Sequence, residues 1–197
     1  MPLLVQKYGG TSVGTAERIR AVADRVRRAR EAGNEVVVVV SAMGDTTDRL
    51  IQLACEVAPD PDRRELDVLV STGETQSTAL VTMALHAMGC PAISLVGSQL
   101  GIKTDKAYSR ARIMEVNPDR IRAELARGFC VILPGFQGMT EEGDITTLGR
   151  GASDLTAIAV AAALDAPKCE IYTDVDGVYT TDPRVVPEAR LVPRISY

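Results

Sequence analysis

The first dozen residues carry the side chains and the backbone that a phosphate-binding site requires. An apolar stretch at residues 3–5 leads into Lys7 and the adjacent pair Gly9 and Gly10, and a helical pattern follows. Glycines lack the Cβ atoms that keep a ligand away from backbone N–H groups, and Lys7 adds a positive charge. The N-terminal end of the following helix would contribute its dipole. We therefore expect an anion, most simply a phosphate, at the end of the first strand.

The spacing of these residues excludes the two commonest nucleotide-binding loops. A Walker A motif places a lysine directly after its second glycine, whereas Thr15 follows Gly14 in this chain. The Rossmann spacing G-x-G-x-x-G also fails, because Gly9 and Gly10 are adjacent. Taken alone, the motif is also compatible with a plain strand-to-helix turn that carries a solvated lysine.

Polar residues follow a second apolar run. Residues 41–47 come directly after residues 35–40, a β-branched run typical of a strand buried on both faces. Small hydroxyl side chains suit a second contact to phosphate or carboxylate, and Thr46 or Thr47 would equally serve as a helix N-cap. Further along, Glu74 stands where we expect another helix to start. An acid there either stabilises the helix dipole or receives a substrate ammonium group.

Arg150 stands between Gly149 and Gly151, before an alanine-rich helical stretch. The glycines leave room for a small planar anion, and a guanidinium binds a carboxylate through two parallel hydrogen bonds. Ser153 or Asp154 is expected to cap the helix that follows. The segment therefore predicts a carboxylate site, with a solvated arginine in a turn as the simpler alternative.

The last polar segment, residues 173–184, follows the final clear strand. Its Asp174 and Asp176 suggest an EF-hand loop, but Gly177 comes at the fourth position of such a loop, where the sixth is required. A loop at the edge of a nucleotide site fits this pattern better.

Strands alternate with helices along the chain. Apolar runs predict strands at residues 3–8, 35–40, 91–96, 129–133 and 169–173. Helical patterns occupy residues 15–30, 46–57, 65–70, 74–88, 117–127 and 153–164. Residues 138–149 predict a hairpin, whereas the polar stretch 97–108 gives no clear pattern. This alternation predicts an α/β fold, a three-layer α/β/α sandwich with a mostly parallel central sheet. Because ligands bind at the carboxyl ends of such strands, we expect four segments to share one site: residues 7–12, 41–48, 135–138 and 173–177.

Composition limits the possible functions. The 197 residues include 22 Lys and Arg against 26 Asp and Glu, and a net charge of −4 argues against a general nucleic-acid partner. No apolar run approaches the length of a membrane span and no signal-peptide pattern opens the chain, so we expect a cytoplasmic location and no membrane partner. His86 is the only histidine, and the four cysteines form no C-x-x-C pair. We therefore expect no metal site within the protein and no histidine-based triad.

Five segments together resemble motifs of the aspartokinases, a family of the amino acid kinase superfamily, and they occur in the family's order. They are residues 7–13 (KYGGTSV), 40–43 (VSAM), 71–74 (STGE), 147–151 (TLGRG) and 173–184 (TDVDGVYTTDPR). The resemblance covers essentially the whole chain. The last segment is shared with related kinases of the superfamily, whereas the first, third and fourth together are much more specific to aspartokinases.

The resemblance implies ATP-dependent phosphorylation of the β-carboxylate of L-aspartate, with Mg²⁺. The products would be 4-phospho-L-aspartate and ADP, in the first step toward lysine, threonine and methionine. A carboxylate nucleophile is already ionised at pH 7 and needs no general base, so the reaction does not require a catalytic histidine. What it requires is positioning of the reactants and neutralisation of charge on the transferring phosphoryl group.

The resemblance also implies roles for individual residues. The catalytic residues would be Lys7, Glu74 and Asp154, with Asp154 orienting Lys7. The nucleotide would be bound by Lys7, Tyr8, Gly9, Gly10, Ser41, Thr173, Asp174, Tyr179, Asp182 and Arg184. Aspartate would be bound by Thr47, Glu74, Arg150, Gly151, Ala152, Ser153 and Asp154. Within that set, Glu74 would hold the α-ammonium group and Arg150 the α-carboxylate.

Two features depart from the family pattern. The family usually has Gly and Thr where this chain has Ala152 and Leu155, and a positive φ at Ala152 would strain the substrate loop by about 1 kcal/mol. Family kinase domains also continue beyond the position of Tyr197, and regulatory ACT domains normally follow them. We therefore expect residues 1–197 to form a partial catalytic domain without an ACT domain. It would act as a homo-oligomer or together with a regulatory subunit or domain.

Two alternatives stay open at this point. One is another kinase of the superfamily, acting on N-acetylglutamate, glutamate or uridylate. Glu74 and the segment around Arg150 favour a free amino acid, because an acylated amino group needs no carboxylate partner. The other alternative is a non-catalytic fragment of the same fold, which would bind aspartate or nucleotide without phosphoryl transfer.

Overall fold

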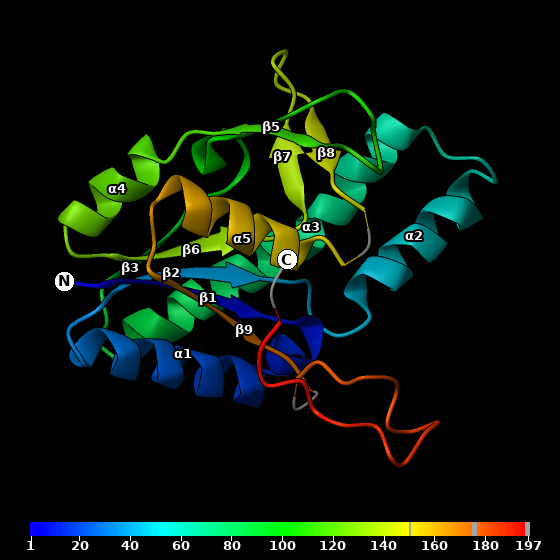
Figure 1. Ribbon diagram of the computed structural model, residues 1–197. Helices are drawn as coiled ribbons and strands as arrows, with labels where there is room; N and C mark the ends of the chain where they lie inside the picture. Colours follow the sequence, from blue (N-terminus) through cyan, green and yellow to red (C-terminus); the bar gives the residue numbers. More distant parts are fainter. Residues whose placement is uncertain (150, 175–176, 196–197) are drawn as a thin grey trace.

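Strand β2 (Glu35–Val40) lies at the centre of the main sheet. Its valines are at most 1% exposed because neighbouring elements cover them on both faces. The computed structural model describes residues 1–149, 151–174 and 177–195. Five strands pair in the order β3-β6-β2-β1-β9, and their pairings are parallel (Figure 1). The four strands beside β2 are β1 (Leu3–Tyr8), β3 (Ala92–Ser94), β6 (Cys130–Pro134) and β9 (Lys168–Tyr172).

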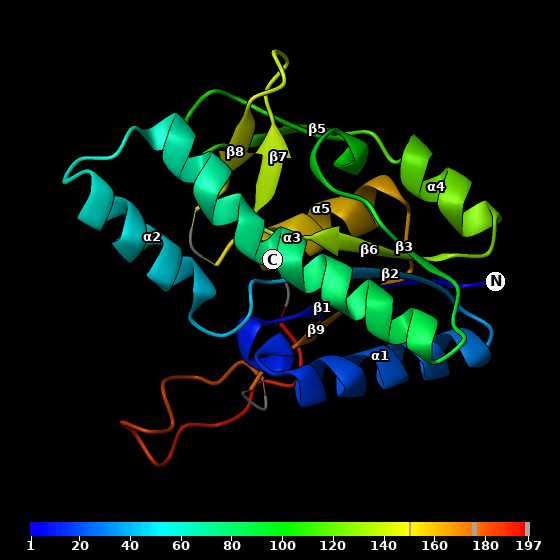
Figure 2. The same cartoon turned by 180° about the vertical axis from the view of Figure 1, so that it is seen from behind.

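Helices cover both faces of this sheet, as Figures 1 and 2 show from opposite sides. Successive side chains of a strand point to opposite faces, so Val38 packs with helices α1 and α3 whereas Val39 packs with α4 and α5. The bounds of these helices are α1 (Ala16–Glu31), α3 (Arg63–Ala87), α4 (Asp119–Ala126) and α5 (Ser153–Ala163). The predicted three-layer sandwich with a mostly parallel central sheet is confirmed.

A second, smaller sheet has the strand order β5-β4-β7-β8. The predicted hairpin is confirmed, since β7 pairs antiparallel with β8. The rest of this sheet was not predicted, because its strands are three or four residues long and show no period of their own. Its elements are β4 (Ile102–Thr104), β5 (Ile113–Val116), β7 (Gln137–Met139) and β8 (Ile145–Thr147), and the 3₁₀ helix η2 (Gly97–Leu100) precedes them.

Helix α3 runs unbroken through residues 71–74, so the prediction of two helices that meet there is wrong. Gly73 does not break the helix. A Cβ at Gly73 would lie 3.0 Å from the Cβ of Ala42, so the glycine allows α3 to approach the loop after β2. The Ser71 hydroxyl donates to the carbonyl three residues earlier, which is compatible with the helix. Glu74 therefore lies in the middle of a long helix and not in its first turn.

Two helix starts also differ from expectation. Helix α5 has Ala152 as its N-cap, without a side-chain bond, so the predicted cap by Ser153 or Asp154 is wrong. The side chain of Asp154 instead pairs with Lys7. Near the start of the chain, the 3₁₀ helix η1 (Gly10–Val13) begins at the second glycine of the pair and precedes α1. The dipole of α1 therefore does not begin at the glycines.

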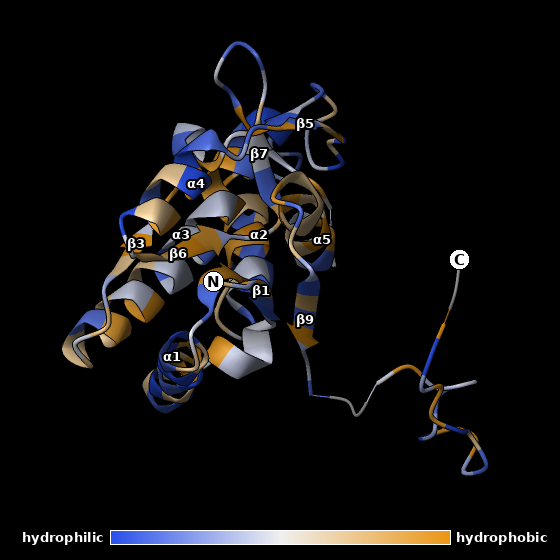
Figure 3. Ribbon diagram, turned by 60° about the vertical axis from the view of Figure 1, so that its left-hand side comes forward, coloured by the Kyte–Doolittle hydropathy of each residue, from blue (hydrophilic) through white to orange (hydrophobic). Residues whose placement is uncertain are grey.

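Several other elements agree closely with the sequence pattern. The predicted ranges 3–8, 35–40 and 46–57 coincide with β1, β2 and helix α2 (Thr46–Val57). Within the described ranges, no helix is long and apolar enough to cross a membrane. Residues 177–195 contain little regular structure apart from a bridge between Tyr179 and Leu191, and Figure 3 shows this part standing away from the helices that cover the sheet.

Candidate functional site

The carboxyl ends of β1, β2, β6 and β9 lie together at one edge of the main sheet. The Ser41 N–H donates to the Tyr8 carbonyl over 3.1 Å, and the Gly135 N–H donates to the last carbonyl of β2 over 2.9 Å. The Gly9 N–H donates to the last carbonyl of β9 over 3.4 Å. The expected meeting of these four strand ends is therefore confirmed for the residues described.

Close backbone contact explains the glycine pair. A Cβ at Gly10 would lie 2.7 Å from the Ala42 carbonyl oxygen, and the Gly44 N–H donates to the Gly10 carbonyl over 3.1 Å. Any side chain at Gly10 would thus separate the loop after β1 from the loop after β2. At Gly9, the nearest atom to an added Cβ would be Lys7 Nζ, at 3.5 Å. Gly9 therefore leaves the face of the lysine ammonium uncovered.

An ion pair fixes the position of Lys7. Its Nζ atom lies 2.7 Å from Oδ1 of Asp154, the second residue of α5. The Lys7 side chain is 11% exposed, whereas that of Asp154 is 45% exposed. The strand thus presents a largely buried cation at the carboxyl edge of the sheet, and the start of α5 supplies the anion that holds it. This is the geometry that the predicted orienting role of Asp154 requires.

Glu74 is a buried carboxyl with one oxygen left open. The residue is 3% exposed, and its Oε1 accepts the Ala42 N–H over 3.2 Å. Its Oε2 is buried without a hydrogen-bond partner among the described residues. Burial raises the pKa of Glu74 from 4.5 to about 7, and backbone N–H donors offset only part of that rise. A buried acceptor without a partner is rare in folded proteins and is suited to receive a cationic ligand group.

The glycine-rich segment that was predicted to bind a carboxylate is described on both sides of Arg150, which itself lies outside the described residues. Gly149 and Gly151 have φ values of 92° and 77°, a region that favours glycine. Ala152 has a φ of −79°, so the backbone strain considered for an alanine at this position does not arise. The alanine is 9% exposed and packs in a small apolar cluster.

Ser153 and Thr47 come from different helices. Ser153 is 7% exposed, and Gly135 makes room for it, because a Cβ at Gly135 would lie 2.6 Å from the Ser153 Oγ. Thr47 is the half-buried second residue of α2. The end of β6 therefore packs directly against the start of α5, which carries Asp154. Leu155, the other departure from the family pattern, is 49% exposed.

A cavity of about 350 Å³ lies between the ends of β1 and β9 and helix α1. Three of the predicted nucleotide residues, Tyr8, Thr173 and Asp174, line it. The Tyr8 and Tyr172 rings stack in this wall with their centroids 4.8 Å apart. Lys7 points to the opposite face of the sheet, toward α5. The described structure thus divides the predicted nucleotide residues between the two faces.

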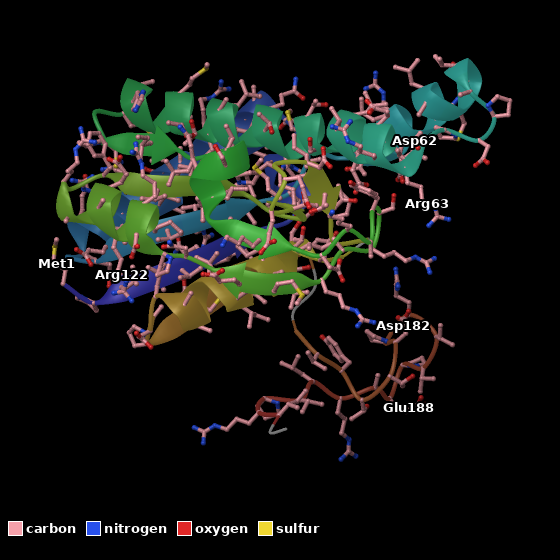
Figure 4. The ribbon with its side chains drawn as sticks, turned by 90° about the horizontal axis from the view of Figure 1, so that it is seen from above. Met1, Asp62, Arg63, Arg122, Asp182 and Glu188 are labelled. Atoms are coloured by element: carbon pink, nitrogen blue, oxygen red, sulfur yellow. The ribbon has the colours of Figure 1, made fainter. Side chains whose placement is uncertain are left out.

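Three further nucleotide candidates lie in the outlying segment. Arg184 pairs with Asp182 over 2.9 Å and holds the pKa of that carboxyl below its usual range. Among the described residues, no hydrogen bond or ion pair joins Asp182 or Arg184 to β1 or α5. Tyr179 bridges to the same segment's second half. Figure 4 places the labelled Asp182 and Glu188 in this segment, apart from the ribbon of the sheet and its helices.

Two residues lie in segments that were expected at the site, but their individual contacts were not predicted from the sequence. The Ala42 backbone N–H donates to Glu74. A backbone contact does not restrict which side chain occupies the position, so the sequence gives no sign of it. Gly135 gives Ser153 its space. A glycine directly after the buried strand end at Pro134 was the available sign, because such glycines often mark close approach of another segment.

Comparison with known proteins identifies a family and individual relatives that agree with each other. The chain matches the amino acid kinase family over residues 2–197. It is 60% identical to an aspartokinase of Thermus thermophilus and 56% identical to an aspartate kinase of Pseudomonas putida. All 197 residues align in both cases, but they cover only 49% and 48% of those proteins. The chain therefore spans about half the length of the curated relatives it matches.

Solved structures give the same relationship. The aspartate kinase from Synechocystis has a TM-score of 0.84 and 53% identity, over 95% of this chain and 31% of that one. E. coli aspartokinase III in complex with aspartate and ADP has a TM-score of 0.83 and 29% identity, over 96% of this chain and 53% of that one.

Proposed function

The chain belongs to the amino acid kinase family, and from this premise we propose that it provides the aspartate-binding and phosphate-binding part of an aspartate kinase. The reaction is transfer of the γ-phosphoryl group of MgATP to the β-carboxylate of L-aspartate. The observation that carries the proposal is the buried Oε2 of Glu74, which has no partner among the described residues and lies beside Ala42, in the loop after β2 that contacts the loop after β1. Similarity to E. coli aspartokinase III, whose structure holds aspartate and ADP, supports the same substrates.

Glu74 selects a substrate that carries a cation. A buried carboxylate without a partner costs several kcal/mol, and an ammonium group that bonds to Oε2 removes that cost. N-acetylglutamate and uridylate carry no ammonium group and cannot do this. The observation therefore favours a free amino acid over the acylated or nucleotide substrates of related kinases.

The chemical step needs charge neutralisation more than proton transfer. One oxygen of the substrate β-carboxylate attacks the γ-phosphorus, and the bond from that phosphorus to the ADP oxygen breaks. The products are an acyl phosphate and ADP, with no proton moved by the protein. Lys7 offsets the negative charge that spreads over the transferring group, and Asp154 keeps the ammonium of Lys7 in place.

The remaining predicted residues would divide between the two ligands. On the nucleotide side we propose Tyr8, Gly9, Gly10, Ser41, Thr173, Asp174, Tyr179, Asp182 and Arg184. On the aspartate side we propose Thr47, Arg150, Gly151, Ala152 and Ser153, with Arg150 on the α-carboxylate. The positive φ values of Gly149 and Gly151, which favour glycine, support a special backbone on both sides of Arg150.

Magnesium fits this site as part of the nucleotide complex. Among the described residues, no three His, Cys, Asp or Glu side chains are grouped so that they could hold a metal ion. In phosphoryl-transfer sites, Mg²⁺ commonly keeps several waters and is bound by substrate phosphates with one or two carboxylates. When bound, the ion would neutralise phosphate charge in addition to Lys7.

The test is an ADP-release assay with MgATP and hydroxylamine, which traps an acyl phosphate as a hydroxamate. L-aspartate, N-acetyl-L-glutamate and no acceptor are compared. Aspartate-dependent ADP and hydroxamate in equal amounts are expected. Product with N-acetyl-L-glutamate and none with aspartate would overturn the assignment. Aspartate binding without turnover would support the non-catalytic alternative for this chain.

A further inference from the structure

Asp67 is a fully buried carboxyl in α3 that the proposed chemistry does not use. The residue is 0% exposed, and it accepts four hydrogen bonds. Its Oδ1 accepts the hydroxyls of Thr147 at 2.8 Å and Ser109 at 3.1 Å. Its Oδ2 accepts the backbone N–H groups of the same two residues, at 2.9 Å and 2.8 Å. Four donors match the acceptor capacity of an ionised carboxylate.

These bonds tie α3 to the strand that leads into the substrate segment. Thr147 is the last residue of β8, and Gly149 follows two residues later. Ser109 has a φ of 66°, a strained value for a serine, and the bonds to Asp67 hold it there. A Cβ at Gly149 would lie 3.6 Å from the Ser109 carbonyl oxygen, so this residue also packs beside the start of the segment.

Asp67 and Glu74 lie on the same face of one helix. They are seven residues apart, which corresponds to two turns and about 10 Å along the axis. Asp67 has all its acceptor sites filled by protein, whereas the Oε2 of Glu74 has no partner in the described structure. The Asp67 carboxyl thus binds groups of the protein itself, whereas the Glu74 carboxyl has an oxygen available for a ligand.

We propose that Asp67 is a positioning residue for substrate recognition, and this rests on the proposed function. It fixes the end of β8, and with it both flanks of the segment that receives the α-carboxylate, at a set distance from Glu74. The two flanks are joined, because the Ala152 N–H donates to the Gly149 carbonyl over 3.3 Å. A single rigid helix then sets the spacing between the sites for the ammonium and the carboxylate of one amino acid.

The four bonds predict a graded response to substitution. Asp67→Ala leaves four buried donors without an acceptor. In Asp67→Asn, the amide oxygen still accepts the two N–H groups, and the two hydroxyls can turn to accept from the amide nitrogen. The asparagine variant should bind aspartate within about threefold of wild type, and the alanine variant at least tenfold more weakly.

Thr147→Val and Thr146→Val form a matched pair that does not depend on the alanine variant folding. Both threonines are buried in β8, and each loses one hydroxyl bond. The Thr147 hydroxyl bonds to Asp67, whereas that of Thr146 bonds to Thr104 at 2.6 Å, away from the segment. Both variants should melt at a lower temperature. Only Thr147→Val should weaken aspartate binding, by about tenfold.

The experiment measures the L-aspartate Kd by calorimetry and the amide exchange of residues 147–149 and 151–153 by mass spectrometry. Weaker binding and faster exchange in Thr147→Val, with both unchanged in Thr146→Val, support the proposal. Equal effects of the two variants on the Kd, or none, overturn it. If the wild-type chain binds no aspartate, the proposed function fails. The amide exchange rates then test by themselves whether Asp67 anchors the segment. Equal exchange rates in the two variants would reject the anchoring role as well.

Discussion

The raised pKa of Glu74 predicts that the proposed binding of aspartate depends on pH. Burial raises that pKa from 4.5 to about 7, so the side chain titrates in the neutral range. The substrate ammonium attracts only the ionised carboxylate, whereas the protonated form is neutral. Affinity for L-aspartate should therefore rise with pH and level off above the pKa. Aspartate itself keeps its ammonium and both carboxylates charged between pH 6 and 8.

The size of the effect follows from the ionised fraction. With a pKa of about 7, roughly one tenth of Glu74 is ionised at pH 6 and about nine tenths at pH 8. The Kd for aspartate should then fall about tenfold between these pH values. Binding at pH 6 should release close to one proton per aspartate, because the ligand stabilises the ionised form.

Calorimetry in buffers of different ionisation enthalpy measures both the Kd and the released proton. Glu74→Gln keeps the acceptor for the Ala42 N–H but cannot ionise, so its Kd should be weak and independent of pH. Succinate lacks the ammonium group, and its binding should weaken as Glu74 ionises. A wild-type Kd for aspartate that is equal at pH 6 and pH 8, with no proton released, would refute the assignment of Glu74 to the ammonium.

The same titration affects stability, with the sign set by the raised pKa. The folded state favours the protonated carboxyl, so this group stabilises the fold most at pH values below its unfolded pKa. Its contribution falls as the pH rises from 4.5 to 7, by about 3 kcal/mol. Denaturant unfolding should show this loss in wild type and not in Glu74→Gln, and saturating aspartate should restore part of it.

Further predictions concern the cation and the backbone. Lys7→Met should lower turnover by about a thousandfold or more while folding is kept, and Lys103→Met, in an exposed ion pair, should leave the hydroxamate assay unchanged. Gly101→Ala should be destabilised more than Gly33→Ala in thermal unfolding. Both glycines have positive φ, at a cost of about 1 kcal/mol for alanine, but only at Gly101 would a Cβ collide, 2.2 Å from the Asn117 carbonyl oxygen. Equal melting temperatures for the two glycine variants would contradict the clash.

Much of the main sheet could be predicted from sequence because its strands are continuous apolar runs. The valines of residues 36–40 leave no polar side, so the strand had to be central. The parallel arrangement then placed the polar loops at one edge, and the loops around Lys7 and Ser41 do meet there. Apart from its hairpin, the second sheet escaped prediction because strands such as β4 gain their stability from distant partners rather than from their own period.

The prediction of two separate helices in place of α3 was wrong for a specific physical reason. Serine, threonine and glycine around position 72 usually end helices, yet here they let α3 approach the loop at Ala42. Asp67, between two apolar residues, gave no sign of its role, because its bonds go to segments more than forty residues away. The seven-residue spacing between Asp67 and Glu74 is visible in the sequence. It places the two carboxyls on the same face only because both lie in one continuous helix.

The place of β1 in the sheet also has a consequence for synthesis of the chain on the ribosome. Strand β1 pairs with β2, which follows it closely, and with β9, whose Glu170 bonds to Gln6 across 164 residues. At about 5 to 20 residues per second, β9 leaves the ribosome on the order of 10 to 30 s after β1. During that interval β1 presents an open edge that another nascent chain could pair with. Chaperone protection of the emerging N-terminal half would therefore matter more for this protein than for one whose first strand finds both partners early.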